Sequence, residues 1–488
     1  MNKYFVEFLC ILSLTFTTFA QIEKKDEPFI VEHFAISILK FGAVGDGKTV
    51  CTQSIQKAID TVSEQGGGFV VVPPGIFLTG TIVLKNDVIL YLSPGSMLIS
   101  STKIDDFPEM IPSYRSYTDN YSQRALIYAE NQKNIGIVGY GKIHGQGELF
   151  KEDENRKYKF RPYLIRLVEC KEINLEGVTY ENGAMWTIHL LACENVRCSN
   201  IRIYSRCNHN NDGIDIDSCE NVAVSDCHIV SGDDSIVLKS TSPKPCRNIT
   251  ITNCILSSLC NALKMGTESN GGFQNISISN CTIYDTHLSG LTIQTVDGGT
   301  TENIVINNIS MQNVRCPIFI RLGNRARPCC PDQPAPGMGT MKRIIISNIV
   351  GTGADSTGCA ISGIPGHDIE EITLRNINLS FKEGIEKPID IPQENEQSYP
   401  EYKMFGTLPA YGFFIRHVKG IFLENINLRS EQKDNRPAIF LTDVKTPIIT
   451  HLYLFNERET GKSITFDNCS NINVKEMYLN GMPQQTHF

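Results

Sequence analysis

The pattern that decides the fold is Asn248-Ile249-Thr250-Ile251, followed 27 residues later by Asn275-Ile276-Ser277-Ile278. It alternates apolar and polar residues, as a β-strand with one buried face does. Related copies are centred on Ile173, Val196, Val222, Ile304, Ile344, Ile372, Ile421 and Ile472. From Ile173 to Ile304 the successive spacings are 23, 26, 27, 27 and 28 residues. A unit of this size cannot bury its apolar face alone, so stacking of successive units is predicted, with parallel strands about 4.8 Å apart. The expected fold is all-β, a parallel β-helix.

Residues at fixed positions within the units support this stacking. Asn or Asp follows the second apolar residue at Asp226, Asn253, Asn280, Asn348, Asn376 and Asn425. Asn side chains at stacked turns can hydrogen-bond to the backbone and to one another. Cys227, Cys254 and Cys281 come next in three units. A buried apolar stack of thiols is favoured over disulfides for these cysteines, although the chain has 17 in total.

The ends and interruptions of the repeat define the domain organisation. Apolar residues from Thr52 to Gln65 recur at helical spacing before Gly66-Gly67-Gly68, which predicts a helix that caps the core. Residues 21–488 are assigned to one β-helix domain. Within it, residues from about 36 to 130 form the N-terminal cap and the first turns of the coil. Insertions are expected at 325–340, 382–411 and 430–463, where the period breaks.

The N-terminus and the overall charge indicate an exported protein that binds neither nucleic acid nor membrane. Lys3, the mostly apolar run 8–19 and Thr18-Phe19-Ala20 resemble a signal peptide over residues 1–20, with a buried N-terminal helix as the alternative. No other stretch is long and apolar enough to span a bilayer. The net charge of −8 argues against nucleic acid and anionic lipid as main partners. Export to the periplasm or outside the cell is expected. The protein is expected to be a monomer.

Five Asp residues gather between residues 212 and 234, and their spacing points to chemistry. Asp212 and Asp233 lie 233 − 212 = 21 residues apart, so they are expected on neighbouring turns. Ile214 and Ile216 take the inward face, which sends Asp212 and Asp233-Asp234 outward. Carboxylates this close repel one another and raise at least one pKa, as glycoside hydrolysis requires. The alternatives are turn-capping Asp residues, or a calcium-dependent lyase with Lys239 or Lys264 as its base. We expect neither a metal nor a cofactor.

These residues resemble the polygalacturonases, family 28 of the glycoside hydrolases, over most of the chain. The family's Asn-Thr-Asp-Gly motif is matched by Asn210-Asn211-Asp212-Gly213, and its Gly/Gln-Asp-Asp motif by Gly232-Asp233-Asp234. The resemblance implies a right-handed β-helix and hydrolysis with inversion. It implies Asp233 as the general acid, with Asp212 and Asp234 holding the attacking water.

Two motifs of that family are altered here. Its Gly-His-Gly motif corresponds to Cys260-Asn261-Ala262, and its Arg-Ile-Lys motif to Thr292-Ile293-Gln294. The resemblance assigns substrate binding to the positions of Asn261, Thr292 and Gln294, but an amide cannot carry the charge of the missing His, Arg and Lys. A glycosidase acting on another linkage of a pectin-like polysaccharide is therefore favoured over an ordinary endo-polygalacturonase. A non-catalytic carbohydrate-binding β-helix is a further alternative.

Other polar residues complete the predicted substrate site. Asn210 and His209 precede Asp212 closely enough to line a cleft, although His209 also suits a turn. Lys239, Lys264, Arg321 and Arg325 are candidate replacements for the missing cations. The alternatives are solvated edges for the two Lys and a loop-anchoring network for the Arg residues. Trp186 is either a sugar platform or a core residue.

Overall fold

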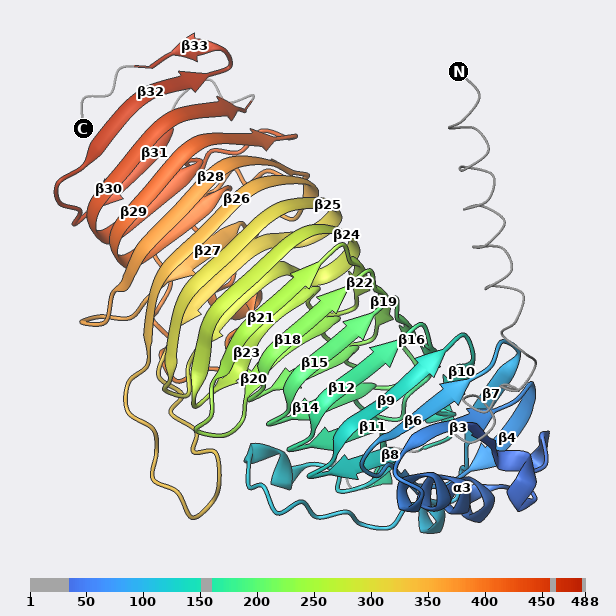
Figure 1. The fold of residues 1–488 in the computed structure, drawn as a ribbon. Helices are drawn as coiled ribbons and strands as arrows, with labels where there is room; N and C mark the ends of the chain where they lie inside the picture. The colour runs from blue at the N-terminus through green and yellow to red at the C-terminus, as the bar shows by residue number, and fades with distance from the viewer. Residues whose placement is uncertain (1–34, 151–159, 457–461, 485–488) are drawn as a thin grey trace, which may run out of the picture.

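The computed structural model describes residues 35–150, 160–456 and 462–484. It is the predicted right-handed parallel β-helix, in which successive turns of the chain, here called rungs, stack into one elongated solenoid (Figure 1). All strand pairings are parallel except that of β32 with the terminal β33 (Met482–Pro483). The expected signal peptide at 1–20 lies outside the described residues. None of the helices within the described ranges is long and apolar enough to cross a membrane.

Each rung contributes strands to three faces, and the later strands bend from one face to another. The first face contains β1 (Ala35–Ser37), β3 (Gly68–Val72), β6 (Val88–Leu92), β9 (Lys133–Gly139), β12 (Lys171–Glu176), β15 (Glu194–Ser199), β18 (Glu220–Ser225) and β21 (Cys246–Thr252). The second contains β2 (Asp46–Val50), β4 (Gly75–Thr79), β7 (Ser96–Ser100), β10 (Lys142–His144), β13 (Thr179–Glu181), β16 (Arg202–Ser205), β19 (His228–Ser231) and β22 (Ile255–Ser258).

The third face carries the strands next to the carboxylates. It contains β5 (Ile82–Val83), β8 (Ala125–Glu130), β11 (Tyr163–Val168), β14 (Ile188–Leu191), β17 (Ile214–Asp217), β20 (Ile236–Ser240) and β23 (Leu263–Ser269). The later rungs are built from β24 (Gly272–Thr295), β25 (Thr300–Leu322), β26 (Thr340–Ala354), β27 (Cys359–Ser362), β28 (Ile369–Phe381), β29 (Phe413–Ser430), β30 (Ile439–Phe455), β31 (Ile464–Asp467) and β32 (Asn473–Leu479).

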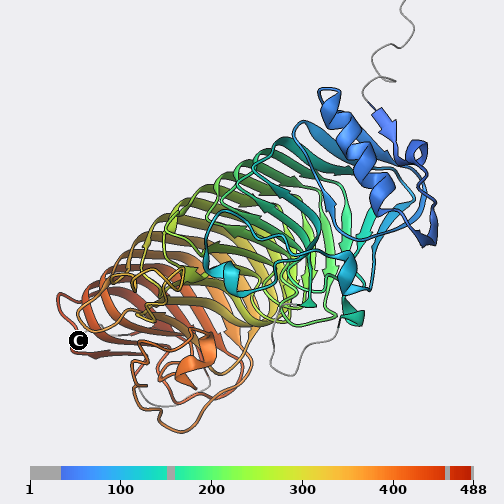
Figure 2. The ribbon, with the colours of Figure 1, turned by 90° about the horizontal axis from the view of Figure 1, so that it is seen from below.

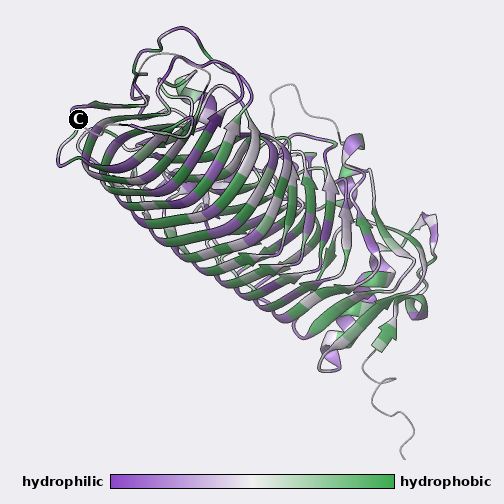
Figure 3. Ribbon diagram, turned by 90° about the horizontal axis from the view of Figure 1, so that it is seen from above, coloured by the Kyte–Doolittle hydropathy of each residue, from purple (hydrophilic) through white to green (hydrophobic). Residues whose placement is uncertain are grey.

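The repeat predicted from the sequence is the register of the first face. Ile173 pairs with Val196, Val196 with Val222, and Val222 with Ile249, and the column continues through Ile276, Ile304, Ile344, Ile372 and Ile421. All of these side chains are buried in one continuous core. Figure 3 shows the resulting alternation of apolar and polar residues along the strands. Burial of this column makes a register shift costly, because a one-residue slip would turn the apolar set outward.

Turn residues and cysteines follow the prediction. Asn253 and Asn376 adopt left-handed backbone conformations, with φ of 57° and 52°, and donate side-chain hydrogen bonds to Asp226 and Asn348 one rung away. All 16 described cysteines are free thiols, and Cys227, Cys254 and Cys281 are buried in the core. The predicted stack of thiols is therefore confirmed for the described residues.

The predicted cap is α3 (Thr52–Glu64), which buries Ile55, Ala58, Ile59 and Val62 against the first rungs (Figure 1). Short 3₁₀ turns accompany the insertions: η1 (Ile38–Phe41), η2 (Ile104–Asp106), η3 (Tyr117–Asn120), η4 (Gly147–Leu149) and η6 (Tyr402–Phe405).

Three insertions interrupt the rungs around the site, at residues 101–124, 323–339 and 382–412. The second and third were predicted. The expected insertion at 430–463 is wrong for its central half, which is β30 and pairs with β29 along a full rung. Its turn is built from Thr446 and Pro447, where earlier units such as that of Ile249 have Asn-Ile. Segment 101–124 was not predicted to leave the coil. Figure 2 shows 101–124 (blue-green) and 382–412 (orange) on one side of the solenoid.

Candidate active site

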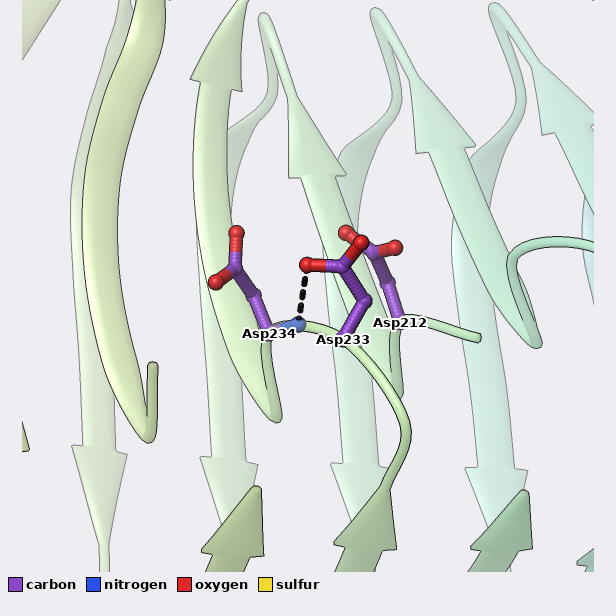
Figure 4. A group of neighbouring side chains, drawn as sticks. All are labelled: Asp212, Asp233 and Asp234. Atoms are coloured by element: carbon purple, nitrogen blue, oxygen red, sulfur yellow. Dashed lines mark hydrogen bonds between the residues drawn. The ribbon is translucent and has the colours of Figure 1, made fainter. Parts of the chain in front are cut away.

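Two adjacent rungs bring the three predicted carboxylates together. Asp212 comes just before β17, and Asp233 and Asp234 come just before β20, which pairs with β17 through Ile214 and Ile236. The Gly213 N–H donates to the Asp234 carbonyl at 2.9 Å across this junction. One oxygen from each of the three carboxylates lies within 4.8 Å of the other two (Figure 4). The winding of the chain thus joins acids that are 21 residues apart, as the period predicted.

The carboxylates line a pocket of about 220 Å³. Asp212 and Asp234 are only 2% exposed, whereas Asp233 is partly exposed. The side chains leave the outer face of the rungs, as predicted, but the insertions enclose them. The described residues that line the pocket are Tyr121, Met185, Trp186, Asn210, Asp212, Asp233, Asp234, Lys239, Lys264, Thr267, Glu268, Arg327 and Tyr399.

Two buried lysines contact the carboxylates. The Lys239 Nζ lies 3.5 Å from oxygens of both Asp212 and Asp215, and the Lys264 Nζ lies 3.0 Å from Asp234 and 3.5 Å from Glu401. Burial lowers the pKa of each lysine, but the neighbouring carboxylates outweigh it and raise both pKa values well above normal. Both side chains are therefore protonated and cannot act as the base of a lyase. Neither Lys239 nor Lys264 is solvated at the edge of a rung, because both side chains are buried.

The acids themselves are shifted toward protonation. Burial, reinforced by the charge of Asp234, raises the pKa of Asp233. Burial, with the charges of Asp215 and Asp233, raises the pKa of Asp212 well above its usual range. Mutual repulsion at this distance favours a state in which the cluster shares a proton. The cluster can therefore offer both a carboxylic acid and a carboxylate.

Asn261 lies directly against this cluster. Its Nδ2 donates to Asp234 Oδ1 at 2.8 Å and to Glu401 at 3.4 Å, and its Oδ1 accepts from the Ser289 N–H at 3.0 Å. Asn261 is fully buried, so it orients Asp234 and does not reach into the pocket. An imidazole in this position could exchange a proton with Asp234. The amide of Asn261 can only hold the Asp234 carboxylate in place by a hydrogen bond.

Four other predicted substrate residues lie away from the pocket, and the expectation for them is corrected. Arg321 is fully buried, with its guanidinium donating to Ser362, Gly363 and Glu394. Thr292 and Gln294 are buried, and Gln294 donates to the Pro400 carbonyl at 2.9 Å. Arg321 and Gln294 contact segment 382–412, and Thr292 accepts from Gln294; the sequence predicted the segment but not that it packs on these residues. His209 is exposed on the turn before Asp212 and is not part of the pocket lining.

The remaining predictions concern residues at or near the lining. Asn210 lines the pocket, and its Oδ1 accepts from Arg161 at 3.0 Å. Arg325 stands behind the lining and binds Asp297, while Arg327 lines the pocket and pairs with Glu268. The alternative of a loop-anchoring network therefore describes Arg321 and Arg325. Trp186 lines the pocket although it is only 4% exposed.

Several residues of the site were not predicted. Tyr121 packs edge-to-face on Trp186 with 5.5 Å between ring centroids, and Tyr399 lies over Lys264. Both come from insertions whose course has no periodic signal. Asp215 is fully buried beside Asp212, and Asp217 accepts from the Thr241 hydroxyl at 2.6 Å. The alternation around Ile214 and Ile216 places both Asp on the outward face and could have indicated their role.

The three carboxylates also have the spacing of a divalent-cation site. The ammonium groups of Lys239 and Lys264 already lie against Asp212 and Asp234, so a cation would have to displace them or bind beside like charge. The chemistry of the cluster is therefore described more directly by acid and base groups than by metal ligands.

A β-helix with a pocket of carboxylates over its rungs defines the class of carbohydrate-active enzymes that use paired acids. Residues 97–400 match the model of Glycosyl hydrolases family 28, and the chain therefore belongs to this family, as the resemblance predicted. A probable polygalacturonase from Vitis vinifera is 36% identical over 215 residues, which cover 42% of this chain and 44% of that protein.

Other relatives match over more of the chain. Polygalacturonase-2 from Solanum lycopersicum is 26% identical over 80% of this chain and 84% of its own length. The crystal structure of a hyperthermoactive exopolygalacturonase from Thermotoga maritima superposes with a TM-score of 0.61 at 25% identity, covering 74% of this chain and 88% of that one.

Proposed function

We propose that the protein hydrolyses a glycosidic bond in a pectin-like polysaccharide by single displacement, with Asp233 as the general acid. The observation that carries this proposal is the cluster of Asp212, Asp233 and Asp234, of which Asp233 is the most exposed to the pocket. Burial and the charge of Asp234 raise the pKa of Asp233, which favours the protonated form that a general acid needs. The altered substrate motifs argue against an ordinary endo-polygalacturonase.

In the proposed reaction, Asp233 donates its proton to the glycosidic oxygen as the bond from this oxygen to the anomeric carbon breaks. A water molecule held by Asp212 and Asp234 forms the new bond to that carbon, and one of these carboxylates accepts the water's proton. Lys239 and Lys264 lie against these two carboxylates and keep them in place. Transfer of the proton back to Asp233 completes the cycle.

The stereochemical outcome is a test of this assignment. In glycosidases, carboxyl groups about 5–5.5 Å apart generally accompany retention, and about 6.5–9.5 Å inversion. The limit of 4.8 Å applies to one oxygen of each acid and not to the distance between whole carboxyl groups, and the family likeness implies inversion. We favour inversion because Asp212 and Asp234 face the same space and can share one water. The anomer of the first product, read by proton NMR, should be inverted, and a retained anomer would contradict the assigned roles.

Asp233→Asn tests the acid. The substitution keeps the size of the side chain and removes its proton-donating role, so kcat on a defined pectic oligosaccharide should fall by about 10²–10⁴-fold. Asp226→Asn is the matched control, because Asp226 is an exposed turn residue on the same rung and Asn keeps its acceptor role toward Asn253. Unchanged turnover in the first variant, with binding preserved, would favour a carbohydrate-binding protein.

Export and oligomeric state remain predictions about the whole chain. Residues 1–20 are inferred to direct export, which cleavage after Ala20 would reveal in the mass of the secreted protein. A monomer is expected, which size-exclusion chromatography with light scattering tests.

A further inference from the structure

We infer that the sugar unit held in this pocket is uncharged, so the protein cleaves next to a neutral sugar and not next to a uronic acid. This inference rests on the proposed function and names the chemical class of its substrate. It goes beyond the family likeness, because the relatives described above carry names that refer to galacturonate polymers.

The first support is that every cation in the described lining is already paired. Lys239 lies 3.5 Å from Asp212 and Lys264 lies 3.0 Å from Asp234. The guanidinium of Arg327 binds Glu268 and also lies 3.6 Å over the ring of Tyr117. A uronate carboxylate would have to share one of these cations with an acid that already lies against it, and so would add negative charge beside a buried carboxylate.

The second support is the balance of charge in the pocket. The described lining contains four acids, Asp212, Asp233, Asp234 and Glu268, against three cations, Lys239, Lys264 and Arg327. Two further acids, Asp215 and Glu401, lie within 3.5 Å of the same lysines. One proton on the cluster only brings the lining to neutrality, so an added carboxylate meets acids and no unpaired cation.

The third support is that uncharged residues occupy the two positions at which the family likeness implies Arg and Lys. Thr292 and Gln294 occupy them, and Gln294 instead donates to the Pro400 carbonyl beneath segment 382–412. Arg325, the nearest replacement, is held by two hydrogen bonds to Asp297. Segment 382–412 therefore holds Gln294 outside the pocket lining.

The shape and apolar wall of the pocket suit one neutral ring. Its volume of about 220 Å³ is below the roughly 300–1,000 Å³ of pockets for larger ligands. Met185, Trp186 and Tyr121 also line the pocket, and an aromatic ring there can contact the C–H face of a sugar.

The test compares matched pairs of p-nitrophenyl glycosides that differ only at C6, such as galactoside and galacturonide, in both anomers. The neutral member of the preferred pair should have a kcat/KM at least 100-fold higher than its uronic acid. Equal or faster hydrolysis of the uronide would overturn the inference.

Binding to Asp233→Asn separates this inference from the proposed hydrolysis. Calorimetry with galactose, rhamnose, glucose and their available uronic acids should show binding of a neutral sugar and none of the uronates, even where no glycoside is cleaved. Preferential uronate binding would overturn the inference whether or not the enzyme is active.

Glu268→Gln is a variant that should gain activity on the uronide. The substitution frees Arg327, so kcat/KM for the uronide should rise about 10-fold relative to the neutral glycoside. Glu302→Gln is the control, because Glu302 pairs with Arg343 on the exterior of a later rung. If both variants changed the ratio of kcat/KM for the uronide to that for the neutral glycoside equally, the role given to the Arg327–Glu268 pair would be contradicted.

Discussion

Asp212 and Asp215 share one ammonium group, that of Lys239, which lies 3.5 Å from an oxygen of each. Asp215 is fully buried, and the Lys239 ammonium is the cation that lies beside its carboxylate. Burial, followed by the charge of Asp215, raises the pKa of Asp212. Asp215 does not line the pocket, so we regard it as a positioning residue that sets the charge on Asp212.

Asp215→Asn should therefore change the pH dependence more than the maximum rate. Removing the negative charge lowers the pKa of Asp212, so Asp212 ionises at lower pH and the acid limb of kcat/KM moves down by about one pH unit. The profile of kcat/KM from pH 3 to 8 measures the shift, with Asp226→Asn as the control. A profile that falls in height without moving would assign Asp215 a purely structural role.

Segment 382–412 is the element that distinguishes this site from a plain rung. It is fixed by contacts from the solenoid: Gln294 to Pro400, Arg321 to Glu394, and His417, whose ring nitrogens lie 2.9 Å from Glu394 and 2.7 Å from Asp443. The boundaries of the segment could be predicted because the period stops there. Its course could not, because irregular backbone has no periodicity, and so Tyr399, Glu401 and the structural role of Arg321 were missed.

Arg321→Met tests this anchoring. The variant keeps most of the side-chain volume but removes three hydrogen bonds from Arg321 to segment 382–412 and β27, so thermal stability should fall. KM should rise about 10-fold with a smaller change in kcat, because Tyr399 and Glu401 would be held less firmly beside Lys264. Lys382→Met, at the exposed start of the same segment, is the control. An unchanged KM would show that the segment keeps its position without Arg321.

At the scale of the molecule, the fold follows from a feature that needs no long-range information. The spacing of 23 to 28 residues and the strand alternation agree with one another from Ile173 to Ile304, and Asn occupies a turn of each rung from Val196 onward. Agreement between local signals makes the stack predictable, and it places Asp212 beside Asp233 without any knowledge of the loops. The enclosure of the pocket depends on three separate insertions, so its shape was not predictable from the repeat.

A stack of rungs needs protected ends, and α3 provides this protection at the N-terminus. Its face of Ile55, Ala58, Ile59 and Val62 covers the apolar core that the first rung would otherwise expose. Ile59→Asp places an unpaired charge in a fully buried position and should destabilise the cap by about 4 kcal/mol or more. The uncovered strand edges should then pair between molecules, which light scattering would detect as concentration-dependent association. Gln53→Asp, on the exposed face of the same helix, should leave the protein unassociated. If Ile59→Asp remained dispersed with an unchanged melting temperature, the cap would not be needed to protect the end of the solenoid.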